Sequence, residues 1–250
     1  MTISLRSIFQ AEAAAVAAIP EDQAFGDVVS LLYEKIHQKG GKVIASGMGK
    51  AGQVANNIAT TFSATGTPAI FLHPSEAQHG DLGVIRENDV LLVLSNSGKT
   101  REILELVSLT HQLHPGLPVV LITGNLEGEL VDKSVITLHT GNPQEVCPLG
   151  LTPTTSTTVM MVMGDALTVL LMQKLDLKLQ IMPGGTMAAT WAKNHVTTKT
   201  NENSQKPYYA AGHRHPGAAA ATYGRPYGAD QKYRHPDRRN EDPGCACYGY

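Results

Sequence analysis

The sequence predicts an α/β protein: a doubly wound parallel sheet of about five strands flanked by helices, with a disordered C-terminal tail. Short runs such as Val90–Leu94 are apolar at every position, as expected of strands buried on both faces. These runs alternate with segments whose apolar residues recur at helical spacing, which favours right-handed crossovers between parallel strands. A change of composition near residue 178 separates this body from the tail.

The first half of the body reads as two helices followed by two strands with a helix between them. Helical apolar spacing predicts helices over 4–18 and 23–38. The run Lys42–Ser46 predicts a strand, and Lys50–Ala64 predicts a helix with one apolar face. A second strand is predicted at Ala69–His73.

The second half repeats the alternation. Strands are predicted at 89–95, 119–123 and 135–140, and a helix at 99–113. The last helix, Thr155–Leu175, is apolar over most of its surface. Such a helix lies either between layers or at a subunit contact.

We expect residues 1–178 to form one domain and residues 179–250 to form a tail of low order. Acidic residues outnumber basic ones in the body, and the reverse holds in the tail. Leu179, Ile181 and Val196 are the tail's only leucine, isoleucine and valine residues. So little branched apolar surface does not offset the entropy of ordering a chain.

Composition narrows the function classes. The formal net charge of −2 gives no nucleic-acid signal. We see no apolar run of the about 18 residues that cross a membrane, and no signal peptide. Cys147, Cys245 and Cys247 form neither a disulfide framework nor a convincing zinc motif. We therefore expect a cytoplasmic protein without a metal.

Two strand-to-helix junctions carry the strongest functional signal. Ser46–Lys50 follows the first predicted strand, and Ser95–Thr100 follows the third. Free backbone N–H groups, hydroxyls and the positive end of a helix dipole meet at such junctions and favour a phosphate. The alternative is an ordinary helix cap. The candidate binding residues are Ser46, Gly47, Gly49, Ser95, Asn96, Ser97 and Thr100.

Two charged residues lie in the first turns of the helices that follow these junctions. Lys50 places a cation where the helix dipole disfavours it, so we interpret it as a ligand-binding or oxygen-polarising group. Glu102 is either a second acid of the site or a solvated acid of a first helical turn.

Three further candidates lie in loops at the predicted strand ends. Glu145 stands between two prolines and close to Cys147, and we expect a raised pKa that suits a general base. His79 either moves protons or fastens its loop. Thr155 begins the last helix, where its hydroxyl caps the helix or contacts the ligand.

Together these segments resemble the sugar isomerase (SIS) domain, and more narrowly the D-arabinose 5-phosphate isomerases. The resemblance runs in order over about residues 40–170. It rests on Gly47-Met48-Gly49-Lys50, Thr61–Pro68, His73–Ala77, His79-Gly80-Asp81-Leu82-Gly83, Ser95-Asn96-Ser97-Gly98, Cys147–Leu151 and Met163-Gly164-Asp165-Ala166. Nothing resembles the CBS domains that many members carry, so the chain is similar to the shorter branch.

The resemblance implies a reaction and roles. D-ribulose 5-phosphate and D-arabinose 5-phosphate would interconvert through a cis-enediol, supplying Kdo for lipopolysaccharide or capsule. Glu145 would be the base; Lys50 or His79 would stabilise the oxyanion or assist ring opening; and Glu102 matches a further catalytic position. Ser95, Ser97 and Thr100 would hold the phosphate. The resemblance implies no metal or organic cofactor. It does imply a homotetramer.

The chain departs from the family after the last body helix. The short branch typically has His-His-Gly-Gly-Tyr-Leu-Gly there, whereas this chain has Met182-Pro183-Gly184-Gly185. If the DNA that encodes Thr186–Lys193 is read one base earlier, it can encode His-His-Gly-Gly-Tyr-Leu-Gly-Glu. We hypothesise that the tail is a frameshifted translation that begins near 176–180. The coding DNA decides between this and a genuine divergent tail, and the missing histidine would impair activity.

Two other functions remain open at the level of sequence. One is a non-catalytic sugar-phosphate-binding module, although residues 1–40 carry no DNA-binding helical domain such as a regulator would need. The other is an isomerase of a different phosphosugar, such as a phosphoheptose or a hexulose phosphate. The stretches Cys147–Leu151 and His79–Gly83 weigh against the second.

Overall fold

The computed structural model describes residues 4–177. The domain boundary predicted at residue 178 lies at the limit of the described residues and stays a prediction. The predicted tail and the frameshift hypothesis therefore lie outside the described residues.

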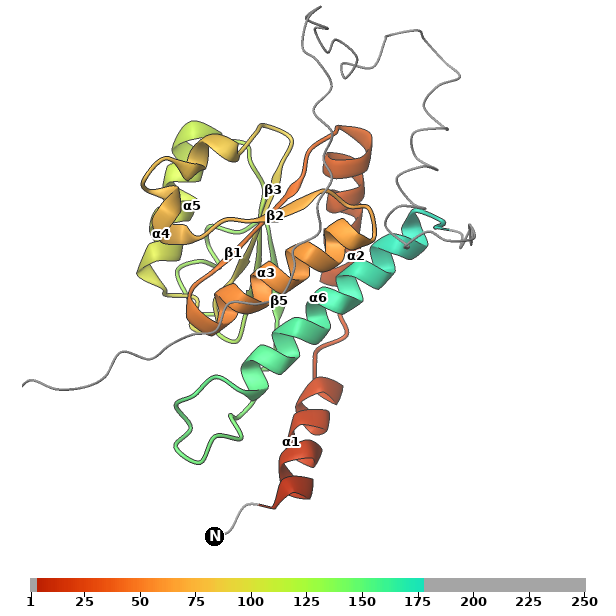
Figure 1. Ribbon diagram of the computed structural model, residues 1–250, viewed down its shortest axis with the longest axis vertical. Coiled ribbons are helices and arrows are strands. Elements are labelled where there is room, and N and C mark those ends of the chain that lie inside the picture. Colours follow the sequence, from red (N-terminus) through yellow and green to blue (C-terminus); the bar gives the residue numbers. More distant parts are fainter. Residues whose placement is uncertain (1–3, 178–250) are drawn as a thin grey trace, which may run out of the picture. The chain divides into compact units, whose positions relative to one another are not determined.

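A five-stranded parallel sheet forms the centre of the fold, as predicted (Figure 1). The strands are β1 (Val43–Gly47), β2 (Ala69–Phe71), β3 (Val90–Leu94), β4 (Val119–Thr123) and β5 (Ile136–His139). Their order across the sheet is β2-β1-β3-β4-β5, and every neighbouring pair is parallel. β1, β3 and β4 are buried at every position, which is why their sequences do not alternate.

Helices occur where periodicity predicts them. They are α1 (Leu5–Ala17), α2 (Ala24–Leu32), α3 (Gly49–Ala64), α5 (Arg101–Leu113) and α6 (Thr155–Lys174). The helix predicted over 23–38 continues from α2 into a π-helical segment, η1 (Tyr33–Gln38). The predictions miss the short helix α4 (Pro74–Ala77) and the 3₁₀ turn η2 (Asp81–Val84), because one turn is too short for a periodic signal.

Two apolar clusters cover the two faces of the sheet. On one face, alternate strand residues such as Ala45 and Leu92 pack with residues of α2, α3 and α6. On the other face, Ile44 and Leu91 pack with α5 and the α4 region. Figure 1 shows α4 and α5 on one side of the sheet and α2, α3 and α6 on the other. Neighbouring residues of one strand thus serve opposite cores.

α6 corrects one expectation from the sequence. It is long and apolar enough, by length and composition, to cross a membrane, whereas the sequence reading found no such run. Half of its most apolar window is buried, and α6 packs on α1, α2 and α3. A Cβ on Gly164 would collide with the Ile58 side chain, so α6 and α3 touch closely there. These contacts bury one side of α6 in the core, and the subunit contact that the sequence also allowed stays a prediction.

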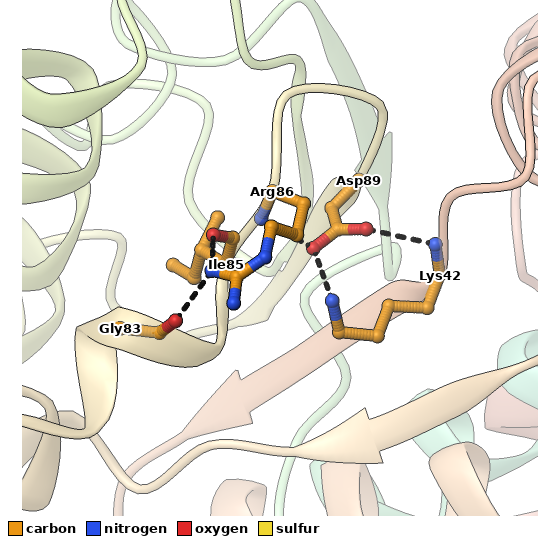
Figure 2. Close-up of polar contacts among 5 residues, drawn as sticks. All are labelled: Lys42, Gly83, Ile85, Arg86 and Asp89. Atoms are coloured by element: carbon orange, nitrogen blue, oxygen red, sulfur yellow. Dashed lines mark hydrogen bonds and ion pairs between the residues drawn. The ribbon is translucent and has the colours of Figure 1, made fainter.

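Asp89 ties the starts of β1 and β3 together (Figure 2). These starts lie at the edge of the sheet opposite the carboxyl ends of the strands. This carboxylate is 1% exposed. It accepts hydrogen bonds from Lys42 N at 2.9 Å, Lys42 Nζ at 2.6 Å and Arg86 N at 2.8 Å. The Arg86 guanidinium in turn donates to the carbonyls of Gly83 and Ile85. A single buried acid thereby fixes two strand starts and the turn between η2 and β3.

Asp89→Ala is expected to lower the free energy of unfolding by about 2–4 kcal/mol, because two backbone N–H groups and the Lys42 ammonium lose their acceptor. Urea unfolding followed by circular dichroism measures the loss. Glu87→Ala, an exposed acid two residues away, is the control and should change stability little. A loss below about 1 kcal/mol would show that solvent replaces the network.

Candidate functional site

The topology of the sheet places the two predicted junctions side by side. The chain passes from β1 to β2 on one side and later enters β3 on the other, so β1 and β3 flank the topological switch point. Ligands of doubly wound sheets bind at this point, beyond the carboxyl ends of the strands. Gly47 pairs with Leu94 in the sheet register, so Ser95 follows immediately beside the first junction.

The helices that begin at these junctions both have open N-termini. The N-cap residues are Met48 for α3 and Thr100 for α5, and neither side chain makes a capping hydrogen bond within the described part of the chain. Their first N–H groups therefore remain available to a ligand. Two helix dipoles with free donors at adjoining strand ends form a site suited to an anion.

The Ser95–Thr100 loop is held in a defined shape by hydrogen bonds. Ser95 Oγ and Thr100 Oγ1 lie 2.9 Å apart and share a hydrogen bond. Ser97 Oγ accepts from Lys99 N at 3.2 Å, and the Ser97 carbonyl accepts from Asn125 Nδ2 at 2.9 Å. Asn96 and Ser97 are exposed. The loop is thus pre-shaped and leaves donors toward solvent, where a phosphate could approach.

Close backbone packing supports this loop from below. Gly98 has φ +63°, and a Cβ on Gly128 would lie 2.7 Å from Gly98 Cα. Leu130 N donates to the Gly98 carbonyl at 3.1 Å. Sequence reasoning missed Asn125 and Gly128. The glycine-asparagine pair after β4 is a turn signal that points to Asn125, whereas no local pattern indicates Gly128.

At the first junction the predicted residues divide into buried and open ones. Ser46 is fully buried and donates to the Leu72 carbonyl at 2.7 Å, so a ligand contact would require it to give up that bond. Gly47 allows α3 to approach, since a Cβ there would lie 2.9 Å from the backbone of Ala51. Gly49 has φ +56° and open space around its Cα.

The charged candidates lie at the same edge of the fold. Lys50 is exposed in the first turn of α3, and Glu102 is half-buried in the first turn of α5. His79 is exposed in the turn between α4 and η2. Among the described residues, the Nδ1 atom of His73 is buried without a hydrogen-bond partner, a feature that the sequence did not reveal.

Glu145 lies against the N-terminus of α6. Its Oε2 atom accepts from Thr154 N at 2.7 Å, Thr154 Oγ1 at 2.8 Å and Ser156 N at 3.3 Å, and its Oε1 atom accepts a short hydrogen bond from the Ser156 hydroxyl. The carboxylate therefore supplies the cap that the Thr154 side chain does not. Of these three N-termini, α6 alone is closed by a side chain.

The expectation of a raised pKa for Glu145 is wrong. Partial burial does push the pKa upward, but the hydrogen bonds from Ser156 and Thr154 outweigh burial and lower the pKa from 4.5. Donated hydrogen bonds stabilise the carboxylate more than the acid. Glu145 is therefore ionised at neutral pH, as a base must be, but it is a weaker base than predicted.

Cys147, two residues after Glu145, also receives several hydrogen bonds. Hydrogen bonds from the backbone and hydroxyl of Thr152, and from the backbone of Leu149 and Leu151, lower the pKa of its thiol to about 6. The same donors favour the thiolate over the thiol. Glu145 thus lies in a loop whose donors favour anions.

Thr155 is 1% exposed, and its hydroxyl is engaged within the protein. It accepts from Val146 N at 3.1 Å and donates to Glu12 Oε1 at 3.0 Å. Contact between Thr155 and a ligand stays a prediction, with this internal role beside it. Glu12 was not among the residues identified from the sequence.

Packing of α6 on α3 connects the Glu145 loop with the switch point. Figure 1 shows the two helices side by side and running in the same direction, so their N-termini lie at the same end of the fold. Lys50 is at the start of α3, and Glu145 caps the start of α6. The arrangement gathers an anion site, a cation and a carboxylate at one edge. Within residues 4–177, no group of three or more His, Cys, Asp or Glu could hold a metal ion.

The family model described as SIS domain matches residues 35–170. Arabinose 5-phosphate isomerase KdsD of Shigella flexneri is 44% identical over 152 residues, which cover 61% of this chain and 46% of that protein. The KdsD of Pseudomonas aeruginosa is 48% identical over 133 residues, covering 53% and 40%. The chain thus spans about half the length of the curated relatives it matches.

Two solved structures are similar as well. One is a Bacteroides fragilis protein to which a phosphosugar isomerase role in capsule formation is ascribed: TM-score 0.69, 56% identity, and coverage of 70% of this chain and 91% of that one. The other is Escherichia coli CFT073 c3406 in complex with arabinose 5-phosphate: TM-score 0.66, 30% identity, and coverage of 76% and 95%.

Proposed function

This chain belongs to the SIS domain family, and we propose that it is an aldose–ketose isomerase that interconverts D-ribulose 5-phosphate and D-arabinose 5-phosphate. The observation that carries the proposal is the pair of uncapped helix N-termini at the switch point, at the same end of the fold as an ionised carboxylate. The KdsD relatives and the arabinose 5-phosphate complex of c3406 support the choice of substrate.

The chemistry assigns a task to each part of the site. N–H groups of α3 and α5 hold the phosphate, with Ser95, Ser97 and Thr100. Glu145 removes a proton from C1 of the ketose while the C2 oxygen gains one, which gives a cis-enediol. Return of a proton to C2 and loss of the O1 proton then yield the aldehyde, so no atom is gained or lost.

The remaining charged residues act on oxygens. Lys50 or His79 stabilises the oxyanion that develops during enolisation or assists ring opening, and Glu102 shuttles an oxygen proton. Ser46, Gly47, Gly49, Asn96 and Thr155 shape or line the phosphate site.

We further propose a cytoplasmic homotetramer that supplies Kdo synthesis. The sparse cysteines fit a reducing compartment. Leu5 and Phe9 on α1 are 67% and 63% exposed, and Val169 on α6 is 52% exposed, which favours contact with other copies. The relatives' names and the capsule role ascribed to the Bacteroides fragilis protein support the metabolic setting.

The direct test incubates the purified chain with D-ribulose 5-phosphate and quantifies D-arabinose 5-phosphate by NMR. We expect conversion, and a rate at least about 10-fold higher when the tail is re-encoded in the alternative frame that restores the histidine-glycine-glycine motif. Saturable binding of both pentose phosphates without conversion by either chain would instead favour the non-catalytic sugar-phosphate module. Conversion of another phosphosugar alone would favour a different isomerase.

A further inference from the structure

Glu12 makes a long-range contact that neither the fold nor the proposed chemistry explains. It lies on α1, a helix without a single fully buried residue, and reaches across the chain to the start of α6. Its Oε1 atom accepts a hydrogen bond from Thr155 Oγ1 at 3.0 Å, although 143 positions separate the two residues.

The Thr155 hydroxyl links Glu12 to Val146 through two consecutive hydrogen bonds. Thr155 Oγ1 accepts from Val146 N at 3.1 Å through a lone pair. The single hydroxyl proton of Thr155 is donated to Glu12. The order of donation is therefore Val146 N–H to Thr155, then Thr155 O–H to Glu12. Thr155 is 1% exposed, so water does not compete with these bonds.

This chain of bonds ends on the backbone of the residue that follows Glu145. The loop between β5 and α6 has no regular structure over Thr140–Thr154, so these contacts and the capping bonds of Glu145 fix its path at this point. The carboxylate bonds hold the tip of the Glu145 side chain, whereas the Glu12 chain holds the backbone that carries it. Together they set the orientation of the base.

The Glu12 carboxylate also lowers the stability of the fold, which argues against a purely structural role. Its second carboxylate oxygen, Oε2, is buried and has no hydrogen-bond partner among residues 4–177. A buried acceptor without a donor costs free energy, which an apolar residue at this position would avoid. The contact with Thr155 is the gain that offsets this cost.

We propose that Glu12 is a positioning residue for Glu145, acting through Thr155 and Val146. The proposal rests on the proposed function, in which Glu145 is the base. It predicts that loss of the Glu12–Thr155 bond slows proton transfer more than it weakens substrate binding, since a base displaced by a fraction of an ångström still leaves the phosphate site intact.

The test compares the full chain with a set of variants. Glu12→Ala and Thr155→Val each remove the Glu12–Thr155 hydrogen bond. The double variant loses this same bond only once, so its effect should not exceed that of a single variant. Glu12→Gln keeps an acceptor for the Thr155 hydroxyl and can place its amide where Oε2 stands without a partner. Gln10→Ala, an exposed residue of the same helix, controls for damage to α1.

We expect kcat to fall about 10-fold in each single variant and the double variant to be no worse than either single one. KM should stay within about 2-fold in Glu12→Ala, which leaves the Thr155 hydroxyl in place. Glu12→Gln should retain kcat within about 3-fold. Additive losses in the double variant, or a Glu12→Gln loss as large as that of Glu12→Ala, would overturn the proposal.

Hydrogen–deuterium exchange provides a readout that does not need catalysis. Exchange at the Val146 amide should rise in Glu12→Ala and Thr155→Val but not in Glu12→Gln. If the wild-type chain isomerises neither pentose phosphate while this exchange pattern holds, the proposed function fails and the contact stands. If exchange at Val146 is unchanged in both single variants, the positioning role is wrong, whatever the activity.

Discussion

Glu145→Gln is expected to lower kcat for the interconversion of the two pentose phosphates by about 10³-fold, since a positioned general base contributes about 10²–10⁴. Gln keeps one oxygen to accept from the N-terminus of α6, but it cannot take a proton from carbon. Exchange of the substrate's C1 hydrogen with deuterated solvent should disappear together with isomerisation. Rapid-quench kinetics and NMR measure the two rates.

The lowered pKa of Glu145 adds a signed pH dependence. Its pKa lies below the usual range of a glutamate because Ser156 and Thr154 donate to the carboxylate, so the acidic limb of kcat/KM is expected at a lower pH than an ordinary glutamate would give. The same shift means that Glu145 stabilises the fold above its unfolded pKa and that this contribution is lost as the pH falls through the folded pKa. Glu145→Gln should therefore flatten the acid dependence of both activity and stability.

The matched control for this substitution is Glu87→Gln. Glu87 is exposed in the turn before β3, at the edge of the sheet opposite the site, and should retain wild-type kcat. If Glu145→Gln retained C1 hydrogen exchange, the base would be another group, and Glu102 would be the first candidate. If activity and unfolding temperature instead fell together, the cap of α6 would be the residue's main contribution.

The sheet was predictable because burial on both faces leaves a local signature. β1, β3 and β4 are strands of five residues that are buried at every position, and their predicted positions agree with the structure within one residue. The edge strand β2 is two residues shorter than predicted, since His73 already belongs to the start of α4. Edge strands carry a weaker pattern because one side has no partner strand.

The site was predictable only where chemistry and sequence order coincide. Ser46–Lys50 and Ser95–Thr100 each unite a strand end, a glycine and a helix start in one segment, and the structure places them at adjoining strand ends. Glu12 and Gly128 act through contacts with distant segments and have no local pattern. The pKa of Glu145 was predicted with the wrong sign, because nothing in the sequence indicated that its carboxylate caps α6.

Lys50→Met is expected to reduce kcat/KM by about 10²-fold while leaving the protein as stable as before or slightly more stable. Lys50 places a cation in the first turn of α3, where the helix dipole penalises positive charge by about 0.3–1 kcal/mol. If Lys50 instead contributed to the stability of the fold, Lys50→Met would lower the free energy of unfolding. Thermal unfolding and steady-state kinetics of the same preparation test both effects.

Inorganic phosphate separates the two ways in which Lys50 could act. If Lys50 contacts the developing oxyanion, phosphate should raise the unfolding temperature of Lys50→Met as much as that of wild type, because the N–H groups of α3 and α5 still bind it. If Lys50 holds the phosphate itself, that protection should shrink. Lys133→Met, which removes an exposed lysine of the turn before β5, should alter neither activity nor phosphate protection. If Lys50→Met lost activity only because its unfolding temperature fell, a functional role for Lys50 would be contradicted. The helix-dipole argument predicts that activity falls while the unfolding temperature does not.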